Sequence, residues 1–180
     1  MPRYVALLRA INVGGHVVKM DALRRQFEAL GFSGVSTHIA SGNVLFTARA
    51  GARGAAERRI ADSLERALGY AVATFLRTGT EMAVAAAHAP YTDLADSDSL
   101  SVGFLARTLT AGERNALRAF ENDVDDFALH AGEVYWRSRV RISRSKFTLA
   151  RFERALGVQA TFRNVTTVRA IAALMAGDDG

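Results

Sequence analysis

The sequence predicts an α+β protein made of duplicated βαββαβ (ferredoxin-like) halves, with a linking helix between them and a C-terminal helix. The first observation behind this prediction is the order of local patterns. Segments typical of strands and helices follow each other as βαββαβ over residues 1–78, and the same succession starts again at residue 100. In such a unit the first and third strands are neighbours, and we therefore expect two separate sheets, each with helices on one face.

The second observation is an internal repeat. The peptide Glu-Arg-Ala-Leu-Gly at residues 65–69 recurs at residues 153–157, and the hairpin motif at residues 41–46 has an analogue at 131–136. The two recurrences are offset by 88 and 90 residues, so independent landmarks agree on a duplication. The alternative is that Ala-Leu-Gly is only a common helix ending, since it also occurs at residues 29–31.

In the first half, a mainly apolar run is long enough for a central strand, and Arg9 is its single charge. The first helix starts near Met20, and Gly31 stands where a left-handed cap belongs. A Gly-Asn pair before Val44 suits a hairpin turn, and Gly69 ends the second helix. The predicted strands span residues 4–11, 35–39, 44–47 and 71–77, and the predicted helices span 20–30 and 56–68.

The second half repeats these signals after a linking segment. Thr80 is a plausible cap for a linking helix that ends before Pro90, and Thr110 with Glu113 forms a capping box. Residues 89–99 are polar and acidic, which is typical of a linker. The predicted strands span 100–106, 127–130, 134–142 and 158–162, with helices from 110, from 149 to Gly157, and around 168–175. The predicted domains are 1–78, a linking segment 79–99, and 100–180.

Composition narrows the classes of protein. The 180 residues are 49% hydrophobic, enough to bury a sizeable core, and they include no cysteine, which excludes disulfides and thiolate chemistry. No signal-peptide pattern and no apolar run of about 18 residues is present, so we expect a cytoplasmic protein without membrane association. The net charge of +5 permits attraction to phosphates, although arginine supplies 21 of the 23 basic residues and could reflect compositional bias.

The loop after the first strand is a candidate anion site. Asn12, Gly14 and Gly15 tolerate positive φ and let a ligand approach the main chain, and Lys19 stands just before a helix start. The pattern is neither a dinucleotide-binding fingerprint nor a P-loop. The alternative reading is a tight turn beside a surface lysine.

Other chemistries have weaker signals. The histidines lack metal-ligand spacing, so no metal site is expected, and no nucleophile elbow surrounds Ser41. Residues 121–126 are rich in carboxylates but lack the calcium-loop pattern, which favours a solvated helix end over a cation site.

A basic run in the second half suggests a polyanion-binding face. If residues 135–142 are extended, Arg137, Arg139 and Arg141 share one face of the strand, and Arg144 and Lys146 extend the charge. These arginines would face water or an anion such as RNA or DNA. A solvated outer face of the sheet is the equal alternative, and the sequence order of an RNA-recognition motif is missing.

Motifs along nearly the whole chain resemble the bacterial family called domain of unknown function 1697. They are Arg3–Gly15, Lys19–Met20, Leu30–Phe32, Ser41–Val44, Ser145–Lys146, Thr161–Asn164 and Thr167–Val168. The resemblance implies a cytosolic α+β protein with a ferredoxin-like part and no established activity, substrate or cofactor. Ala10 stands where that family usually has Gly, and Val165 and Thr166 replace its usual Trp and Asn.

Three functions are compatible with these residues: a binding module for a phosphate-bearing ligand, nucleotide or nucleic acid; a small-molecule enzyme using the same polar residues; or a structural or protein-interaction domain. We favour the first, because no His, Cys or carboxylate stands in the shared motifs as an obvious acid or base, although Lys146 could act as one. The candidate ligand-binding residues are Asn12, Gly14, Gly15, Lys19, Ser41, Asn43, Lys146, Arg163, Asn164 and Thr167. The sharpest expectation is that the first loop meets Arg163 and Asn164 in one anion-binding cleft.

Overall fold

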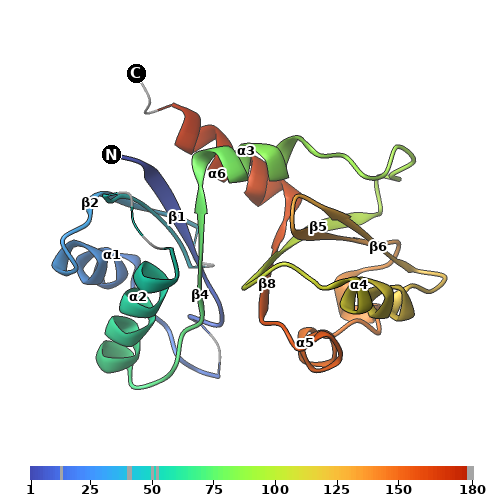
Figure 1. Cartoon of the computed structure of the whole chain (residues 1–180), viewed down its shortest axis with the longest axis horizontal. Coiled ribbons are helices and arrows are strands. Elements are labelled where there is room, and N and C mark those ends of the chain that lie inside the picture. The colour runs from blue at the N-terminus through green and yellow to red at the C-terminus, as the bar shows by residue number, and fades with distance from the viewer. Residues whose placement is uncertain (13, 40–41, 50, 52, 178–180) are drawn as a thin grey trace. The chain divides into compact units, whose positions relative to one another are not determined.

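The structure is a computed structural model that describes residues 1–12, 14–39, 42–49, 51 and 53–177. The chain divides into two compact units, unit 1 (Met1–Met82 with Ile171–Gly180) and unit 2 (Ala83–Ala170). Each contains one four-stranded sheet (Figure 1). The α+β class expected from the sequence is therefore confirmed.

Unit 1 has the sheet order β2-β3-β1-β4, and every pairing in it is antiparallel. Its elements are β1 (Arg3–Leu8), α1 (Met20–Ala29), β2 (Ser33–His38), β3 (Asn43–Thr47), α2 (Arg53–Leu68), β4 (Thr74–Thr78) and the start of α3 (Gly79–Ala87). The expected pairing of the first and third strands is confirmed.

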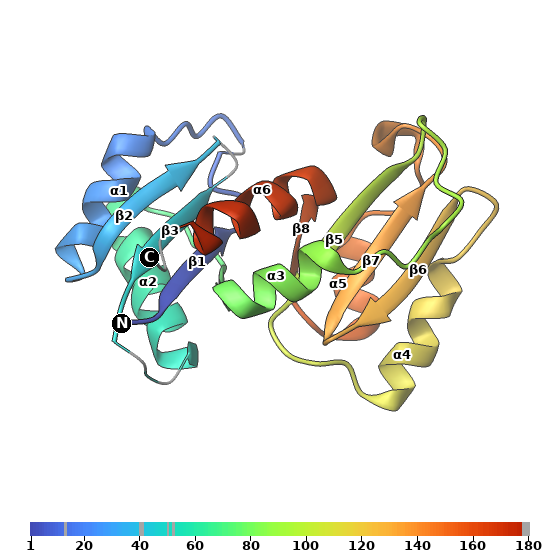
Figure 2. The same ribbon diagram turned by 90° about the horizontal axis from the view of Figure 1, so that it is seen from above.

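Helices α1 and α2 cover one face of this sheet (Figures 1 and 2). Their apolar stripes supply Leu23 and Phe27 from α1 and Ile60 and Leu64 from α2, all fully buried. These side chains pack with strand residues such as Phe46 in one core cluster. Burying each such side chain contributes about 1.5–3 kcal/mol, so this face holds unit 1 together.

Unit 2 has the order β6-β7-β5-β8, again with antiparallel pairings only. Its elements are the rest of α3, β5 (Ser99–Leu105), α4 (Ala111–Leu117), the 3-10 helix η1 (Arg118–Phe120), β6 (Asp125–His130), β7 (Glu133–Ser138), the 3-10 helix η2 (Ile142–Arg144), α5 (Leu149–Leu156), β8 (Ala160–Asn164) and the start of α6 (Val165–Ala176).

The core of unit 2 is rich in aromatic rings. Helices α4 and α5 lie on one face of the sheet (Figure 1), and Phe152 from α5 meets Phe120 and Phe162 at centroid distances of 5.9 and 5.6 Å. Phe162 fills the space above Gly103, where an added Cβ would stand only 2.6 Å from the ring. A glycine in β5 is therefore required for this close approach.

Three strands are shorter than expected, and one of them is β4, which spans Thr74–Thr78 rather than residues 71–77. The first strand ends at Leu8 rather than near Ile11, because Ala10 adopts a left-handed conformation with φ of 59°. The strand expected over residues 134–142 ends at Ser138, and η2 follows.

The capping signals were partly correct. The box of Thr110 and Glu113 at the start of α4 is confirmed. The cap expected at Thr80 is wrong, because α3 already starts at Gly79. Instead, Thr78 accepts from Glu81 N at 3.2 Å and its own N–H donates to the Glu81 carboxylate at 2.8 Å. Within the part of the chain that the structure describes, no helix has the length and apolarity needed to cross a membrane.

Candidate cationic site in unit 2

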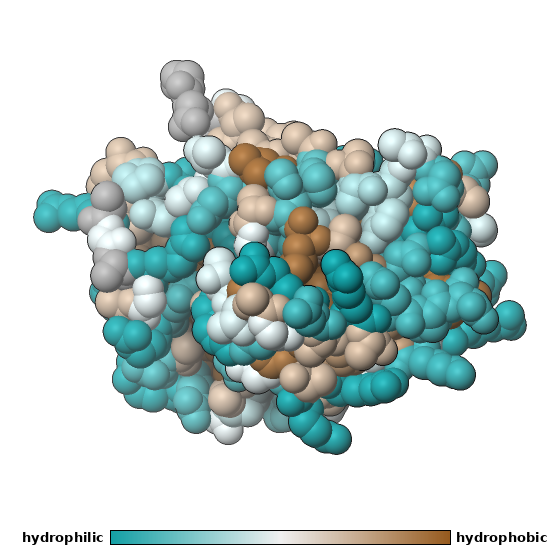
Figure 3. All heavy atoms as spheres, turned by 45° about the vertical axis from the view of Figure 1, so that its right-hand side comes forward, coloured by the Kyte–Doolittle hydropathy of each residue, from teal (hydrophilic) through white to brown (hydrophobic). Residues whose placement is uncertain are grey.

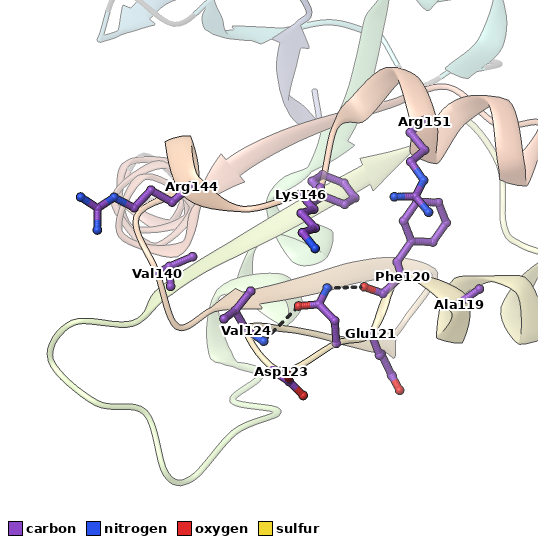
Figure 4. A pocket seen from close by; sticks show the side chains of 11 residues that line it. Ala119, Phe120, Glu121, Asp123, Val124, Val140, Arg144, Lys146 and Arg151 are labelled. Carbon is purple, nitrogen blue, oxygen red and sulfur yellow. Dashed lines mark hydrogen bonds between the residues drawn. The ribbon is translucent and has the colours of Figure 1, made fainter.

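The candidate site is a cavity of about 440 Å³ in unit 2. Its walls come from the end of η1 and the loop after it, from the segment between β7 and α5, and from the first turn of α5 (Figure 4). The residues that line it are Ala119, Phe120, Glu121, Asn122, Asp123, Val124, Val140, Arg144, Lys146, Phe147 and Arg151. It brings together Arg144 and Lys146, which the sequence singled out, with Arg151, which the sequence analysis missed.

A buried carboxylate fixes the segment that carries Lys146. Ser145 Oγ lies 2.9 Å from both carboxylate oxygens of Asp125, and the same oxygen accepts from Phe147 N at 2.9 Å. Asp125 is fully buried, and hydrogen bonds to an ionised group are stronger than those between neutral groups. Ser145 therefore ties the backbone on both sides of Lys146 to strand β6.

Asp125 also accepts hydrogen bonds from strand β7 and from the loop that lines the cavity. Trp136 Nε1 donates to it from β7 at 2.9 Å, and Asn122 Nδ2 donates to it from the loop at 3.2 Å. Asn122 in turn donates to Phe120 O at 3.1 Å and accepts from Val124 N at 3.0 Å. One carboxylate on β6 thus connects the loop before it, strand β7 and the segment that carries Lys146.

This result corrects the interpretation of residues 121–126 as a solvated helix end. Asp125 starts β6 and is fully buried, and Asp126 bridges to Arg139 at 2.6 Å. No group of three or more potential metal ligands occurs among the described residues.

The three basic side chains at the cavity differ in the contacts they make with the rest of the protein. Lys146 and Arg144 are exposed and make no side-chain hydrogen bond or ion pair with any described residue. Arg151 lies over the Phe120 ring, 5.5 Å from its centroid. In Figure 4 the side chain of Lys146 points toward the loop of residues 120–124, whereas the guanidinium of Arg144 points away.

Glu121 and Asp123 bring negative charge to the same rim. Their carboxylates lie on the side of the loop turned away from Lys146 (Figure 4). The face drawn in Figure 3 is largely hydrophilic, with a hydrophobic strip near its centre. A lysine with three ammonium donors and an arginine at a concave surface can hold an anion such as a phosphate.

The predicted basic face on β7 is wrong for Arg137. Its side chain is only 5% exposed and binds Asp98 and Asp93, each at 2.9 Å. The Tyr91 ring lies 5.4 Å from the guanidinium. Arg139 pairs with Asp126, and Arg139 and Arg141 lie beyond the end of the strand, so the three arginines do not share a strand face. The acidic segment 89–99 thus supplies the anion that Arg137 needs.

The first loop of unit 1 is held in place by hydrogen bonds within unit 1. Asn12 Oδ1 accepts from Val18 N at 2.7 Å, and Tyr70 OH donates to Ile11 O at 2.8 Å. Gly14 and Gly15 have φ of 62° and 84°, which confirms the expected positive φ. Lys19 is exposed at the N-cap position of α1.

The remaining motif residues have structural contacts. Asn43 is fully buried and donates to His38 O at 3.0 Å across the β2–β3 hairpin, while Ser41 lies outside the described residues. Arg163 Nη1 donates to Thr161 Oγ1 at 2.8 Å, and burial lowers its pKa to about 10. Asn164 Oδ1 accepts from Thr166 N at 2.8 Å at the start of α6.

The expected cleft draws on both units. Asn12, Gly14, Gly15 and Lys19 belong to unit 1, whereas Arg163 and Asn164, like the half-buried Thr167, belong to unit 2. The cleft stays a prediction.

Comparisons with known proteins agree with this fold. The chain is similar over 98% of its length, with 23% identity and a TM-score of 0.75, to a solved structure titled "The structure of conserved bacterial protein SP0830 from Streptococcus pneumoniae", of which it covers 99%. This likeness concerns the fold alone. No curated protein matches the sequence. The model of a family described as "Protein of unknown function (DUF1697)" matches residues 1–135, which is most of the chain, and the protein therefore belongs to that family.

Proposed function

We propose that this protein is a binding module for a phosphate-bearing ligand, a nucleotide or a nucleic acid, held in the cavity of unit 2. The observation that carries the proposal is the position of the Lys146 ammonium group. This group lines a cavity of about 440 Å³ and has no anionic partner among the described residues. Arg151 at the same wall and Arg144 at the rim supply further positive charge.

Preorganisation supports this role. A long lysine side chain loses about 1.5–2 kcal/mol of conformational freedom on immobilisation, which weakens binding to a flexible site. Here the backbone of residues 145–147 is already fixed by Ser145 and Asp125, so only the side chain must be ordered by a ligand. Binding costs fall when a site is fixed beforehand.

An enzyme using the same residues is the second candidate. The carboxylate that contacts the Lys146 segment, Asp125, is fully buried and engaged by Trp136, Ser145 and Asn122. A general base must reach the proton that it removes, and Asp125 is placed as a support instead. Lys146 would then have to act as the acid or base, whereas a binding role requires only its positive charge.

The test uses Trp136, the single tryptophan of the chain, as a reporter. It donates to Asp125, so a ligand that orders Lys146 should change its fluorescence. We would titrate the protein with inorganic phosphate, ATP and a single-stranded RNA oligonucleotide, and measure fluorescence and melting temperature. For the RNA, the logarithm of the binding constant should fall with the logarithm of salt concentration by about 0.7 per phosphate neutralised.

The matched variants are Lys146→Ala and Arg154→Ala. Both residues are exposed and basic and make no side-chain hydrogen bond or ion pair with described residues, but Arg154 does not line the cavity. Lys146→Ala should weaken binding about tenfold, as expected for one charge-assisted contact, without changing the melting temperature. If no anion binds, or if Arg154→Ala weakens binding equally, the cavity is not the site and a protein-interaction role becomes the better proposal.

We also propose that the chain of this cytoplasmic protein consists of two duplicated ferredoxin-like halves, residues 1–78 and 100–180, joined by the linking segment 79–99. The shared strand order supports the duplication, since β2-β3-β1-β4 and β6-β7-β5-β8 are the same arrangement. The repeated Gly69 and Gly157 helix ends support it too, because each N–H donates at 2.8 Å to the carbonyl of the repeated glutamate. An experimental structure with different orders in the two sheets would contradict it.

A further inference from the structure

A second cavity, in unit 1, opens onto the core between sheet and helices. It has a volume of about 610 Å³, within the range of small-molecule sites. The end of α1, the start of β2, the end of β3 and the first turns of α2 form its walls. It is lined by Met1, Leu30, Gly31, Phe32, Ser33, Thr47, Ala48, Arg49, Gly51, Ala55, Ala56 and Arg59.

The inner wall of this cavity is apolar. Leu30, Phe32, Ala48 and Ala56 are partly buried and pack against the main core of unit 1. The Phe32 ring lies 4.5 Å from Phe46 and 6.0 Å from Phe27, centroid to centroid. A ligand with an apolar chain would extend this core by covering surface that is now in contact with water.

The charge at the cavity has one sign. Arg49 and Arg59 are its charged lining residues, and no carboxylate lines it among the described residues. Arg59 donates to Leu30 O at the end of α1, and its guanidinium lies 5.7 Å from the Phe32 centroid, so this side chain is held at the wall. Arg49 is exposed and makes no side-chain hydrogen bond or ion pair with any described residue.

From this combination we infer that the cavity of unit 1 binds a small amphiphilic carboxylate, with its aliphatic chain against Phe32, Ala48 and Ala56 and its carboxylate on Arg49 and Arg59. An apolar wall favours the chain, and a guanidinium matches a carboxylate in geometry and charge. The absence of acidic lining residues among those described removes repulsion of the ligand and disfavours amines of the same size. This site is separate from the Lys146 cavity and independent of the function proposed for it.

Octanoate is the probe, and titration calorimetry on the full chain is the measurement. We expect one octanoate to bind per chain, and affinity to rise about fourfold for each methylene group from butanoate to octanoate. Octylamine and 1-octanol, which have the chain but no anion, should bind at least tenfold more weakly.

Four variants locate the site. Arg49→Ala should weaken octanoate binding about threefold to tenfold, and Ala56→Leu should weaken it by filling the cavity. Arg66→Ala, which removes an exposed arginine from the last turn of α2, and Lys146→Ala in unit 2 should bind octanoate as the wild type does. Because Arg49 has no side-chain hydrogen bond or ion pair to lose among the described residues, its variant tests the site even if Ala56→Leu is destabilised.

The inference is overturned if octanoate fails to bind the wild type, if 1-octanol binds as tightly as octanoate, or if Arg49→Ala and Arg66→Ala have equal affinities for octanoate. If Lys146→Ala alone abolishes octanoate binding, the carboxylate binds in unit 2 instead, which rejects this site while leaving the phosphate proposal standing.

Discussion

The two units have the same strand order but differ in the side chain that fixes one hairpin, β2–β3 in unit 1 and β6–β7 in unit 2. In unit 1 the buried Asn43 donates to His38 O across the β2–β3 hairpin. In unit 2 the buried Asp125 on β6 collects donors from Trp136, Asn122 and Ser145. Because the carboxylate accepts several bonds at once, it also orders a cationic segment beside a cavity. The candidate chemistry therefore arises from side chains placed on a shared topology rather than from the topology itself.

Other features are the same in both units. The second helix of each supplies a glutamate that accepts from the last strand, Glu57 from Leu76 N and Glu153 from Ala160 N, both at 2.8 Å. A capping box supported by an arginine also occurs in each, with Arg53 on Glu81 and Arg107 on Glu113. The shared features stabilise the fold, and we expect the unshared ones to carry function.

The largest effect is expected from Asp125→Asn. The amide cannot accept at both ends, so donors from Trp136 and Ser145 compete for one oxygen in a fully buried place. We expect the free energy of unfolding to fall by about 2–4 kcal/mol, measured by urea denaturation. Asn43→Ala in unit 1 should cost less, about 1–3 kcal/mol. The exposed Asp123→Asn is the control, and equal losses for Asp125→Asn and Asp123→Asn would contradict the role of Asp125.

A second effect concerns the acidic segment of unit 2. In Arg137→Ala, Asp93 and Asp98 lose the guanidinium that binds them, and Asp98 is left with a side chain only 4% exposed. We expect the segment 89–99 to open, and chymotrypsin to cleave after Tyr91 much faster than in the wild type. Arg139→Ala removes an ion pair whose side chains are 37% and 30% exposed, and this variant should be cleaved at the wild-type rate. Slow cleavage of both variants would show that other contacts hold the segment.

Local signals predicted much of the fold. Gly157 was expected to end α5 and does so with φ of 59°, and Thr110 with Glu113 caps α4 as expected. These signals act over a few residues, so periodicity and residue type reveal them. The end of β1 was not predicted, because Ala10 has a left-handed conformation that alanine rarely adopts.

The site could be predicted only in part. Lys146 was singled out from its motif, but Asp125 contacts Ser145 across 20 residues of sequence, and no local pattern pairs them. Arg137 binds Asp93 across 44 residues of sequence, so strand alternation alone predicted that its side chain faces water or a polyanion. The burial of Arg137 depends on the position of the acidic segment 89–99 in the fold, and the spacing of residues along the strand does not predict that position.

Relief of backbone strain should increase the free energy of unfolding, by less than the preceding substitutions lower it. Ala10 in unit 1 and Ala131 in unit 2 have φ of 59° and 49°, a region that costs an L-residue about 1–2 kcal/mol. Glycine removes that cost but adds entropy to the unfolded chain, so Ala10→Gly and Ala131→Gly should each stabilise by about 0.5–1 kcal/mol. Ala61→Gly, inside α2, should instead destabilise by about 1 kcal/mol. A loss of melting temperature in Ala10→Gly would show that the strain is absent.

The smallest effect is the pH dependence of the capping box in unit 2. Arg107 donates to both carboxylate oxygens of Glu113 at 2.8 Å, and with Thr110 it lowers the pKa of that carboxyl to about 2. In unit 1 burial raises the pKa of Glu81, and the hydrogen bonds of Arg53 and Thr78 outweigh it, so the net shift is also downward. A folded-state pKa below the ordinary value of 4.5 means that the Glu113 pair stabilises the protein above that pH and is lost as pH falls toward about 2. Melting temperatures of the wild type and Glu113→Gln should therefore differ at pH 7 and converge near pH 2. Glu65→Gln, an exposed change on α2 without a side-chain partner among the described residues, should follow the wild type at every pH, and a constant difference for Glu113→Gln would contradict the linkage.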